Sequence, residues 1–251
     1  MNMKKILLAG ESWFTVMTHI KGFDYFMNSN YDGGADRMIE CLKKSGYEVD
    51  YIPNHEAPRK FPNTMEALQE YGTIILSDIG SNTLLIHPDT FNKSMRTPNR
   101  LKLLREWVNR GGGLVMIGGY LTFQGIDARG HWHDTPVEEI LPVEISPNDD
   151  RVETPEGINP LCQMEHPILE GLPKNWPYFL GYNKLKLRAD ATQLMSIEES
   201  NPFLAVREVG NGRTVAFASD CSPHWGSTEF YDWAHYGQFW TQLAEWAMKK
   251  R

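Results

Sequence analysis

Apolar residues in the first half of the chain gather in short continuous runs separated by stretches of helical spacing. Four runs read as buried strands: Lys5–Ala9, Tyr47–Ile52, Thr73–Ser77 and Leu114–Ile117. Continuous apolar runs of this length are typical of strands covered on both faces. Between them, apolar residues three or four apart predict helices over Gly33–Ser45, from Asn63 onward and over Asn99–Asn109. Asp32 is the predicted N-cap of the first helix and Gly46 the residue just beyond its end.

Strand and helix alternate at a spacing that favours parallel strands joined by right-handed crossovers. The expected fold class is therefore α/β, with a flavodoxin-like, doubly wound and mostly parallel sheet. Sheets of this kind bind ligands beyond the carboxyl ends of their strands. The loops after Ala9, Ile52, Leu76 and Ile117 are the places where a site is expected.

The second half has a different pattern. Strand-like segments cover Asn183–Leu187, Thr192–Ile197, Phe203–Val209 and Arg213–Ala218. Gly210-Asn211-Gly212 is a strong hairpin signal. We therefore expect an antiparallel C-terminal extension of the sheet, followed by a closing helix over Glu229–Lys250. No repeat or linker interrupts the pattern, which predicts a single domain over residues 1–251.

Charge and composition argue against several kinds of partner, compartment and cofactor. The formal net charge is −7, and no internal run of Lys or Arg offsets it, so neither nucleic acid nor a membrane surface is an expected partner. The apolar run after Lys5 is too short for a signal peptide or a membrane span, which predicts a cytoplasmic protein. Three scattered cysteines argue against a disulfide framework or a zinc site, and no cofactor is predicted.

The most informative stretch runs from Gly111 to Gly125. A strand that ends in Gly118-Gly119 and precedes a possible helix is similar to a nucleophile elbow, where only small residues fit beside the presented side chain. The segment Gly118 to Gln124 resembles the Gly-x-Cys-x-Gly-x-Gln motif of the class I glutamine amidotransferase-like superfamily. The resemblance is closest to its "putative glutamine amidotransferase" branch, and it extends through His166–Leu172, Gly210–Arg213 and Asp220–Trp225.

The departures from that family carry most of the functional information. Tyr120 occupies the position of the catalytic cysteine, and Thr122 that of the following glycine. A phenol, with an ordinary pKa near 10, does not replace a thiolate that attacks an amide. His224 matches the histidine of the family's His-x-Glu pair, but Gly226 stands where the glutamate belongs. The resemblance therefore implies the fold without the usual glutaminase reaction.

Other candidate site residues follow the predicted strands. Gly10, Glu11 and Ser12 come after the first strand, and the resemblance implies a supporting role for Glu11, a solvated loop carboxylate being the alternative. Asp78, Ser81 and Asn82 follow the third strand, in a loop that relatives use to offer N–H groups to an oxyanion. An ordinary turn is the favoured interpretation of this loop.

Two further groups carry competing interpretations. Asp220 and His224 are candidate acid and base, and Cys221 between them is a less favoured alternative nucleophile. His131 and His133 are candidate ligand-contacting residues after the predicted elbow. With Asp134 they form a possible metal set, but no metal site is assigned. The long aromatic loop after Ser12, with His19, Phe23, Tyr25, Phe26 and Tyr31, suits a lid or a subunit contact.

Three hypotheses of function result. The first is a protein without glutaminase activity that binds a small polar metabolite or sugar at the strand ends, with Tyr120 in contact with it. The second is a hydrolase or isomerase that uses His224 with Glu11 or Asp220 as acid and base. The third is an assembly or regulatory subunit, in which the aromatic loop makes a homo-oligomer. Fold similarity does not separate the first two, because this architecture hosts many reactions.

Overall fold

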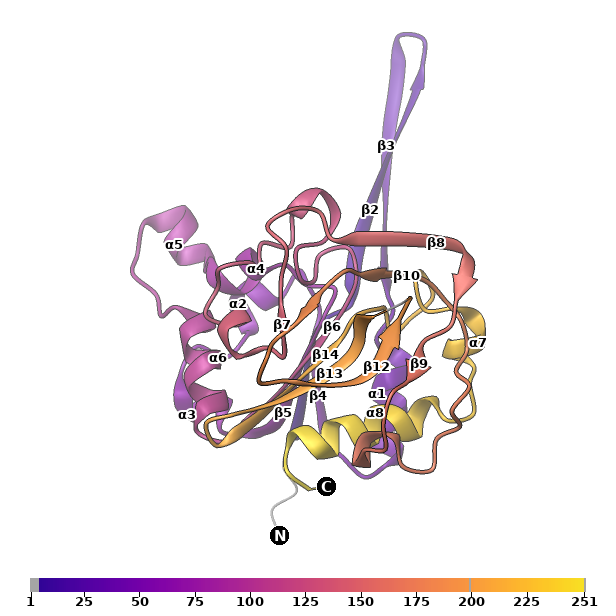
Figure 1. Ribbon diagram of the computed structural model, residues 1–251. Helices are drawn as coiled ribbons and strands as arrows, with labels where there is room; N and C mark the ends of the chain where they lie inside the picture. Colours follow the sequence, from indigo (N-terminus) through magenta and orange to yellow (C-terminus); the bar gives the residue numbers. More distant parts are fainter. Residues whose placement is uncertain (1–4, 199, 251) are drawn as a thin grey trace.

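A central sheet of eight strands organises the protein, whose computed structural model describes residues 5–198 and 200–250 (Figure 1). The strand order across the sheet is β4-β1-β5-β6-β14-β13-β12-β9. The strands are β1 (Lys5–Gly10), β4 (Val49–Ile52), β5 (Tyr71–Ser77), β6 (Gly113–Ile117), β9 (Leu161–Cys162), β12 (Thr192–Ile197), β13 (Asn201–Val209) and β14 (Gly212–Phe217).

The first five strands in this order run parallel to their neighbours. Their side chains are nearly all buried in β1, β5 and β6, as the continuous apolar runs predict. If the five parallel strands are numbered by their order along the chain, they stand across the sheet in the order second, first, third, fourth and fifth. From β1 the chain passes to β4 on one side, and the later parallel strands are added on the other side, so the strand order reverses between β1 and β5.

The antiparallel extension predicted for the second half is confirmed. β13 pairs antiparallel with β14 through the two-residue turn Gly210-Asn211, and β12 and β9 continue the sheet beyond them. The single strand predicted over Asn183–Leu187 is wrong. It divides into β10 (Phe179–Asn183) and β11 (Lys186–Leu187), which leave the main sheet to pair with β8 (Arg151–Ile158) and β7 (Val143–Glu144).

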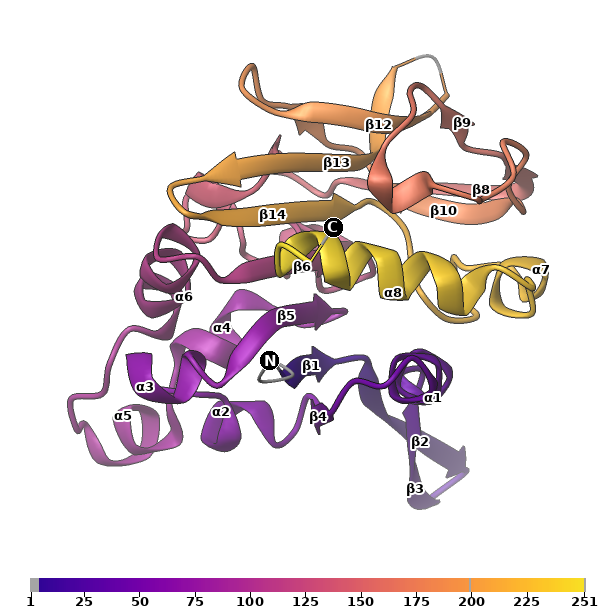
Figure 2. The ribbon, with the colours of Figure 1, turned by 90° about the horizontal axis from the view of Figure 1, so that it is seen from below.

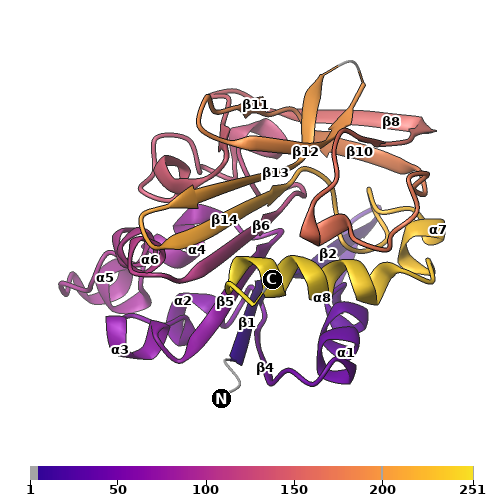
Figure 3. The same ribbon diagram turned by 60° about the horizontal axis from the view of Figure 1, so that its bottom comes forward.

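Helices cover the sheet in two groups. α1 (Asp36–Lys44) and α8 (Tyr236–Ala247) pack against each other, and α8 runs across β5, β6 and β14 (Figures 2 and 3). The remaining short helices are α2 (Ala57–Lys60), α3 (Met65–Leu68), α4 (Ser81–Leu85), α5 (Pro88–Lys93), α6 (Arg100–Asn109) and α7 (Thr228–Tyr231). Of these, α6 packs on β14 and on α3 and α4. Three 3₁₀ turns, η1 (Ile126–Ala128), η2 (Glu138–Ile140) and η3 (Pro167–Leu169), lie in the loops.

Most aromatic side chains of the C-terminal half fill the core rather than line a cleft. Phe217 of β14 packs against Trp240 of α8 with ring centroids 5.2 Å apart, and against Phe203 at 4.9 Å. These three rings are fully buried. Pairs of this geometry add to the stabilisation from apolar burial, and they fix α8 on the sheet.

Three predictions about helices need correction. The closing helix is interrupted between Tyr231 and Tyr236, so α7 and α8 are separate. The N-cap of α1 is Ala35 and makes no side-chain cap, because the chain between Asp32 and the helix belongs to a hairpin strand and a turn. The turn after Gly119 leads into loop and the short η1, not into a helix.

The aromatic segment after Ser12 is not a loop. It forms a two-stranded hairpin of β2 (Ser12–Lys21) and β3 (Asp24–Gly33) that rises away from the rest of the molecule (Figure 1). The prediction missed it because its strands show no clean alternation over their whole length. Among residues 5–198 and 200–250, no helix is long and apolar enough to cross a membrane.

Candidate functional site

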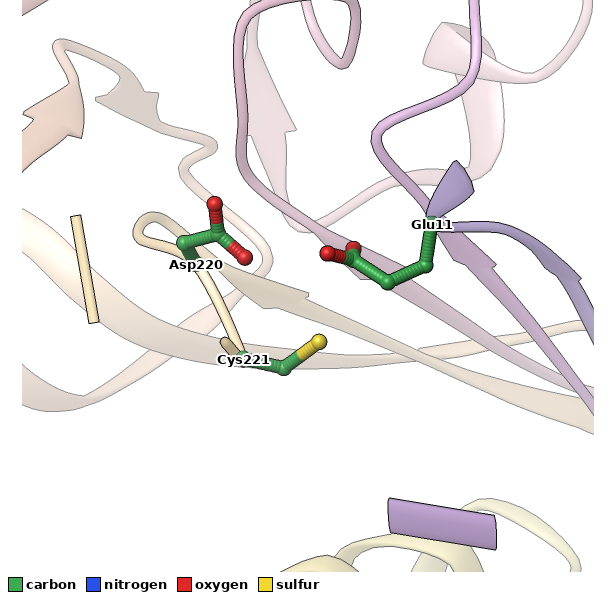
Figure 4. Close-up of side chains that lie close together, drawn as sticks. All are labelled: Glu11, Asp220 and Cys221. Atoms are coloured by element: carbon green, nitrogen blue, oxygen red, sulfur yellow. The ribbon is translucent and has the colours of Figure 1, made fainter. Parts of the chain in front are cut away.

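Three carboxylates meet beyond the carboxyl ends of the parallel strands. Glu11 follows β1, Asp78 follows β5, and Asp220 comes shortly after β14. Figure 4 shows the carboxylates of Glu11 and Asp220 facing each other, with the Cys221 sulfur beside them. The parallel arrangement brings these residues together although more than two hundred positions separate the first from the last.

Glu11 is a buried acid held by hydroxyl groups. Its side chain accepts hydrogen bonds from Ser77 Oγ at 2.6 Å and from Ser222 Oγ at 2.8 Å. Burial, and after it the charges of Asp220 and Asp78, raise the pKa of Glu11 well above its ordinary value. Of the two interpretations of Glu11, the solvated loop carboxylate is wrong, because only 1% of the residue is exposed.

The backbone is strained at both strand ends. Glu11 and Asp78 have φ angles of +49° and +41°, in the left-handed region that side chains other than glycine seldom occupy. Such conformations persist where the surrounding structure holds them, and they concentrate at functional sites. Gly10, just before Glu11, has a φ of +108°, and a Cβ there would lie 1.9 Å from the Ser77 carbonyl oxygen. The close approach of β1 to β5 thus requires glycine at this position.

Asp78 links β5 to the turn after β6. Its Oδ1 accepts a hydrogen bond from the Leu121 backbone N–H at 2.8 Å. Burial, with a contribution from Asp220, raises the pKa of Asp78 to about 6. A Cβ on Gly119 would lie 2.7 Å from the same oxygen. Gly119 therefore lets the Asp78 carboxylate approach the backbone.

Asp220 and His224 form a charge-coupled pair. His224 Nδ1 lies 3.5 Å from Asp220 Oδ2, while Ser222 N–H donates to Asp220 Oδ1 at 3.1 Å. The interaction with Asp220 raises the pKa of His224 above its usual 6.5. Asp220 is almost fully buried, but 40% of the His224 side chain is exposed. An imidazole that is accessible on one side and oriented by a buried carboxylate is equipped for proton transfer.

Aromatic and charged side chains surround His224. The Tyr120 ring meets the imidazole edge-on at 4.3 Å, and the Trp225 ring stacks on it at 5.6 Å. Glu153 of β8 accepts hydrogen bonds from Tyr120 Oη at 2.9 Å and from Trp225 Nε1 at 3.0 Å. The Arg151 guanidinium lies 5.1 Å from the Tyr120 ring. The surface around His224 thus carries the Tyr120 ring, an acid and a cation, and the buried Trp225 ring lies beneath it.

The predicted elbow at Tyr120 is not formed. The positive φ angle of the turn belongs to Gly119, at +150°, and not to Tyr120, and no helix follows. Gly118 and Gly119 are buried, and Asn183 Oδ1 accepts a hydrogen bond from the Gly119 N–H at 3.1 Å. Tyr120 therefore lies on an ordinary turn that a buried amide side chain holds in place.

Cys221 does not have the properties of a nucleophile. It is fully buried, and burial raises the pKa of its thiol well above the ordinary value, with Glu11 and Asp220 adding to the effect. A buried thiol beside two acids stays protonated and inert. Its Sγ lies 3.6 Å from Ser77 Oγ. The geometry favours a structural cysteine over the alternative nucleophile.

The other predicted residues of the strand-end loops have mostly structural contacts. Ser12 is buried, and its Oγ accepts a hydrogen bond from the Asn54 N–H at 2.9 Å. Ser81 N–H donates to the Gly130 carbonyl at 2.8 Å, so this amide is already engaged and not directed at an oxyanion. Asn82 lies exposed on α4. These contacts fix the loops around the carboxylates.

The two loop histidines contact other groups. His131 is exposed with a φ of +54°, and its carbonyl accepts a hydrogen bond from Ser81 Oγ. His133 Nδ1 lies 3.4 Å from Glu138 Oε2, and Nε2 lies 3.6 Å from an Asp134 oxygen. Ligand atoms of His133, Asp134 and Glu138 are close enough together for a metal ion, whereas His131, the third member of the possible metal set, does not belong to this group.

Sequence reasoning missed several residues that hold the site. They are Ser77, Glu153, Asn183, Ser222 and Trp225. Ser222 and Trp225 lie inside the quoted Asp220–Trp225 motif, so their position beside His224 was a usable signal. Glu153 and Asn183 carried none, because β8 and β10 reach the site only through tertiary pairing.

A hollow of about 830 Å³ lies elsewhere, between Cys162 and Trp176. It is lined by neither the carboxylates nor the rings around His224. The candidate site is therefore reached from the open surface at Tyr120 and His224.

The sequence of residues 5–249 matches the model of a protein family described as "Putative glutamine amidotransferase". The chain belongs to this family. The resemblance inferred from the motifs is thus confirmed. No curated protein matches the sequence.

Two solved structures are similar to this amidotransferase-family chain over nearly its full length. Cytoplasmic Protein STM3548 from Salmonella typhimurium is 43% identical, with a TM-score of 0.93 over 97% of this chain and 98% of that one. Cytoplasmic Protein STM1381 from Salmonella typhimurium LT2 is 44% identical, with a TM-score of 0.93 over 97% and 99%. The predicted cytoplasmic location agrees with the names of both relatives.

A more distant structure shares the fold alone. A putative thua-like protein from Bacteroides uniformis is 14% identical, with a TM-score of 0.58 over 98% of this chain and 91% of that one. Its similarity supports a mixed α/β architecture with a large, mostly parallel sheet.

Proposed function

We propose that this protein binds a small polar metabolite or sugar at the carboxyl ends of β1, β5, β6 and β14, and that it does not hydrolyse glutamine. The observation that carries the proposal is the surface around His224. There an accessible imidazole, oriented by buried Asp220, lies against the ring of Tyr120. We further propose that residues 1–251 form one domain, flavodoxin-like and doubly wound.

The chemistry of this surface suits a polyol. Aromatic ring faces pack on the apolar faces of sugar rings, and the partly exposed Tyr120 offers such a ring, with the buried Trp225 packed against it. Glu153, Arg151 and His224 supply an acceptor, a donor and a titratable group around them. A few convergent polar groups beside aromatic rings are the usual composition of a small-molecule site.

The absence of glutaminase activity follows from the nucleophile. Tyr120 replaces the family cysteine, and burial and its hydrogen bond to Glu153 raise the pKa of its phenol. Cys221 is buried and protonated. Neither group provides an accessible anionic nucleophile at neutral pH.

Acid–base catalysis is the second candidate. Asp220 raises the pKa of His224, so the imidazole holds a proton more readily and can offer it as a general acid. Asp220 would orient the imidazole and stabilise its charged form, as a carboxylate does in hydrolases and isomerases that use a histidine.

Thermal-shift measurement against monosaccharides, free amino acids, dicarboxylates and divalent metal salts tests the proposal. A ligand at a hundred times its dissociation constant adds about 2.7 kcal/mol of stability, which raises the midpoint visibly. Tyr120→Phe and His224→Gln should reduce the shift caused by a bound sugar or metabolite. His131→Gln, which alters an exposed histidine outside the cluster, is the matched control.

The outcomes separate the candidates. A compound that shifts the midpoint equally in all variants binds elsewhere and contradicts the proposed site. If a compound is also converted, and conversion is lost in His224→Gln while binding survives, the acid–base candidate replaces simple binding. Release of ammonia from glutamine by the wild-type protein would refute the lack of glutaminase activity.

A further inference from the structure

The hairpin of β2 and β3 is the most exposed feature of the molecule. It begins directly after Glu11 and returns at Gly33, and only the two residues Gly22 and Phe23 join its strands. Ten consecutive residue pairs give each strand a length of roughly 33 Å. In Figure 1 this hairpin stands clear of the sheet and helices.

The hairpin has one apolar face and one polar face. Residues paired across the strands share a face, and successive pairs alternate between faces. One face carries the pairs Phe14–Tyr31, Val16–Ser29, Thr18–Met27 and Ile20–Tyr25. The opposite face carries Trp13–Asp32, Thr15–Asn30, Met17–Asn28, His19–Phe26 and Lys21–Asp24. We call the first set the apolar face and the second set the polar face.

The body of the protein covers only the root of the apolar face. His55 lies 5.2 Å from the rings of Phe14 and Tyr31. Further out, Val16 is 65% exposed and Ile20 is 76% exposed. The polar face also carries large apolar side chains, but they are fewer and less exposed: Trp13 and Met17 are each 40% exposed, and Phe26, which stacks on His19 at 4.4 Å, is 52% exposed. An isolated two-stranded ribbon is at best marginally stable in water, so an uncovered apolar face calls for a partner.

The size of the apolar face fits a protein interface. Its six large apolar side chains are between 46% and 76% exposed: Phe14, Val16, Ile20, Tyr25, Met27 and Tyr31. At the areas typical of large side chains, they present on the order of 600 Å². A stable interface of standard size buries about 800 Å² on each partner. Neighbouring atoms of the hairpin would supply the difference.

We propose that the apolar face of the hairpin packs against the same face of a second copy of this chain. Two copies related by a two-fold axis would stack their hairpins face to face, bury both apolar faces and leave both polar faces in water. Charge disfavours a lipid surface as the occupant. The hairpin carries one lysine, Lys21, against Asp24 and Asp32, and the whole chain has a net charge of −7.

Sedimentation velocity over a wide range of concentration tests this dimer with matched variants of the intact protein. The wild type should be a dimer. Val16→Lys with Ile20→Lys places charges on the apolar face and should raise the dissociation constant by about a hundredfold or more. Thr15→Lys with Met17→Lys adds the same charges to the polar face and should leave the dissociation constant close to that of the wild type.

A shortened protein removes the arm altogether. Joining Ser12 to Gly33 through an Asn-Gly turn is compatible with their pairing, and this variant should be a folded monomer that keeps the helical circular-dichroism signal of the wild type. The proposal is overturned if the wild type is monomeric at every concentration, if both double variants weaken the dimer equally, or if the shortened protein remains a dimer. It is also overturned if the wild type is monomeric and binds phosphatidylcholine–phosphatidylglycerol vesicles through the apolar face.

Discussion

At the scale of single residues, the site depends on Glu11, a buried acid whose charged form is not hydrated by bulk water. Glu11 is held in a left-handed backbone conformation and receives two hydroxyl hydrogen bonds. These bonds favour the charged form, but burial and two neighbouring carboxylates oppose it more strongly. Folding therefore increases the proton affinity of this one side chain, which gives the protein a pH-dependent stability.

The change Glu11→Gln tests that conclusion. The pKa of Glu11 is raised in the folded state, so the folded protein binds its proton more tightly than the unfolded chain does. The free energy of unfolding of the wild type therefore falls as pH rises above the ordinary glutamate pKa. The unfolding free energy of Glu11→Gln should therefore increase relative to that of the wild type as pH increases from acid to neutral. Urea unfolding at several pH values measures the difference.

A surface variant provides the control for this pH dependence. Glu66→Gln removes an exposed carboxylate from α3, and it should follow the wild type across the same range. A constant difference between Glu11→Gln and the wild type at all pH values would contradict a raised pKa of Glu11.

Gly34 leaves the room that Glu11 and Ser222 need. A Cβ at Gly34 would lie 2.3 Å from Ser222 Oγ and 2.5 Å from Glu11 Oε1. We expect Gly34→Ala to lower the free energy of unfolding by about 1–3 kcal/mol, the usual cost of overpacking. At the adjacent Gly33 the nearest atom to a new Cβ is 3.4 Å away, so Gly33→Ala should have little effect. Equal losses in the two variants would show that the contact with Ser222 is not the cause.

At the scale of elements, the second half of the chain holds the turn after β6 in place. Asn183 at the end of β10 is fully buried, accepts from the Gly119 N–H, and donates to Asp150 Oδ1 at 2.8 Å. Glu153 of the partner strand β8 reaches Tyr120. The small sheet of β8 and β10 therefore positions the aromatic side of the site, although it stands outside the main sheet.

Asn183→Ala should loosen this connection. It leaves the buried Gly119 N–H without its acceptor and removes one of the donors to the buried Asp150 carboxylate, at a cost of about 1–3 kcal/mol in unfolding free energy. Asn148→Ala, in an exposed loop before β8, is the control and should change stability little. If the two variants unfold at the same urea concentration, the hydrogen bonds of Asn183 do not stabilise the turn.

At the scale of the whole molecule, the protein has an α/β architecture with a mostly parallel sheet, while the turn at Tyr120 lacks the geometry of a nucleophile elbow. A family nucleophile needs a sharp turn from strand to helix that presents a reactive side chain. Here the turn has its positive φ angle at Gly119, leads into a loop, and is held by Asp78 and Asn183. A cysteine placed at position 120 would therefore lie on the same turn and not on a nucleophile elbow.

Tyr120→Cys should therefore not release ammonia from glutamine above the wild-type background. The introduced thiol should also react with iodoacetamide with the pH profile of an ordinary exposed thiol, after subtraction of the wild-type reaction. Glutaminase activity in this variant, or a thiol that reacts rapidly below neutral pH, would show that the turn still works as a nucleophile elbow.

The sequence alone determined the features that depend on local pattern. Continuous apolar runs predicted the parallel strands, Gly210-Asn211-Gly212 predicted the β13–β14 hairpin, and the motifs identified the family. The sequence also indicated that Glu11, Asp220 and His224 lie near one another, because residues after parallel strands collect at one edge of a sheet. These inferences succeed because hydrophobic spacing and turn chemistry act over a few residues.

The tertiary structure decided the features that depend on distant segments. Side chains brought together across the sheet bury Glu11 and keep Cys221 protonated. They also place Asn183 where it accepts the hydrogen bond from the Gly119 N–H. The predicted elbow failed because the preference for small residues at Gly118-Gly119 is shared by any close approach of two chains. The hairpin of β2 and β3 was missed because its polar and apolar faces become distinct only when the register of the two strands is known.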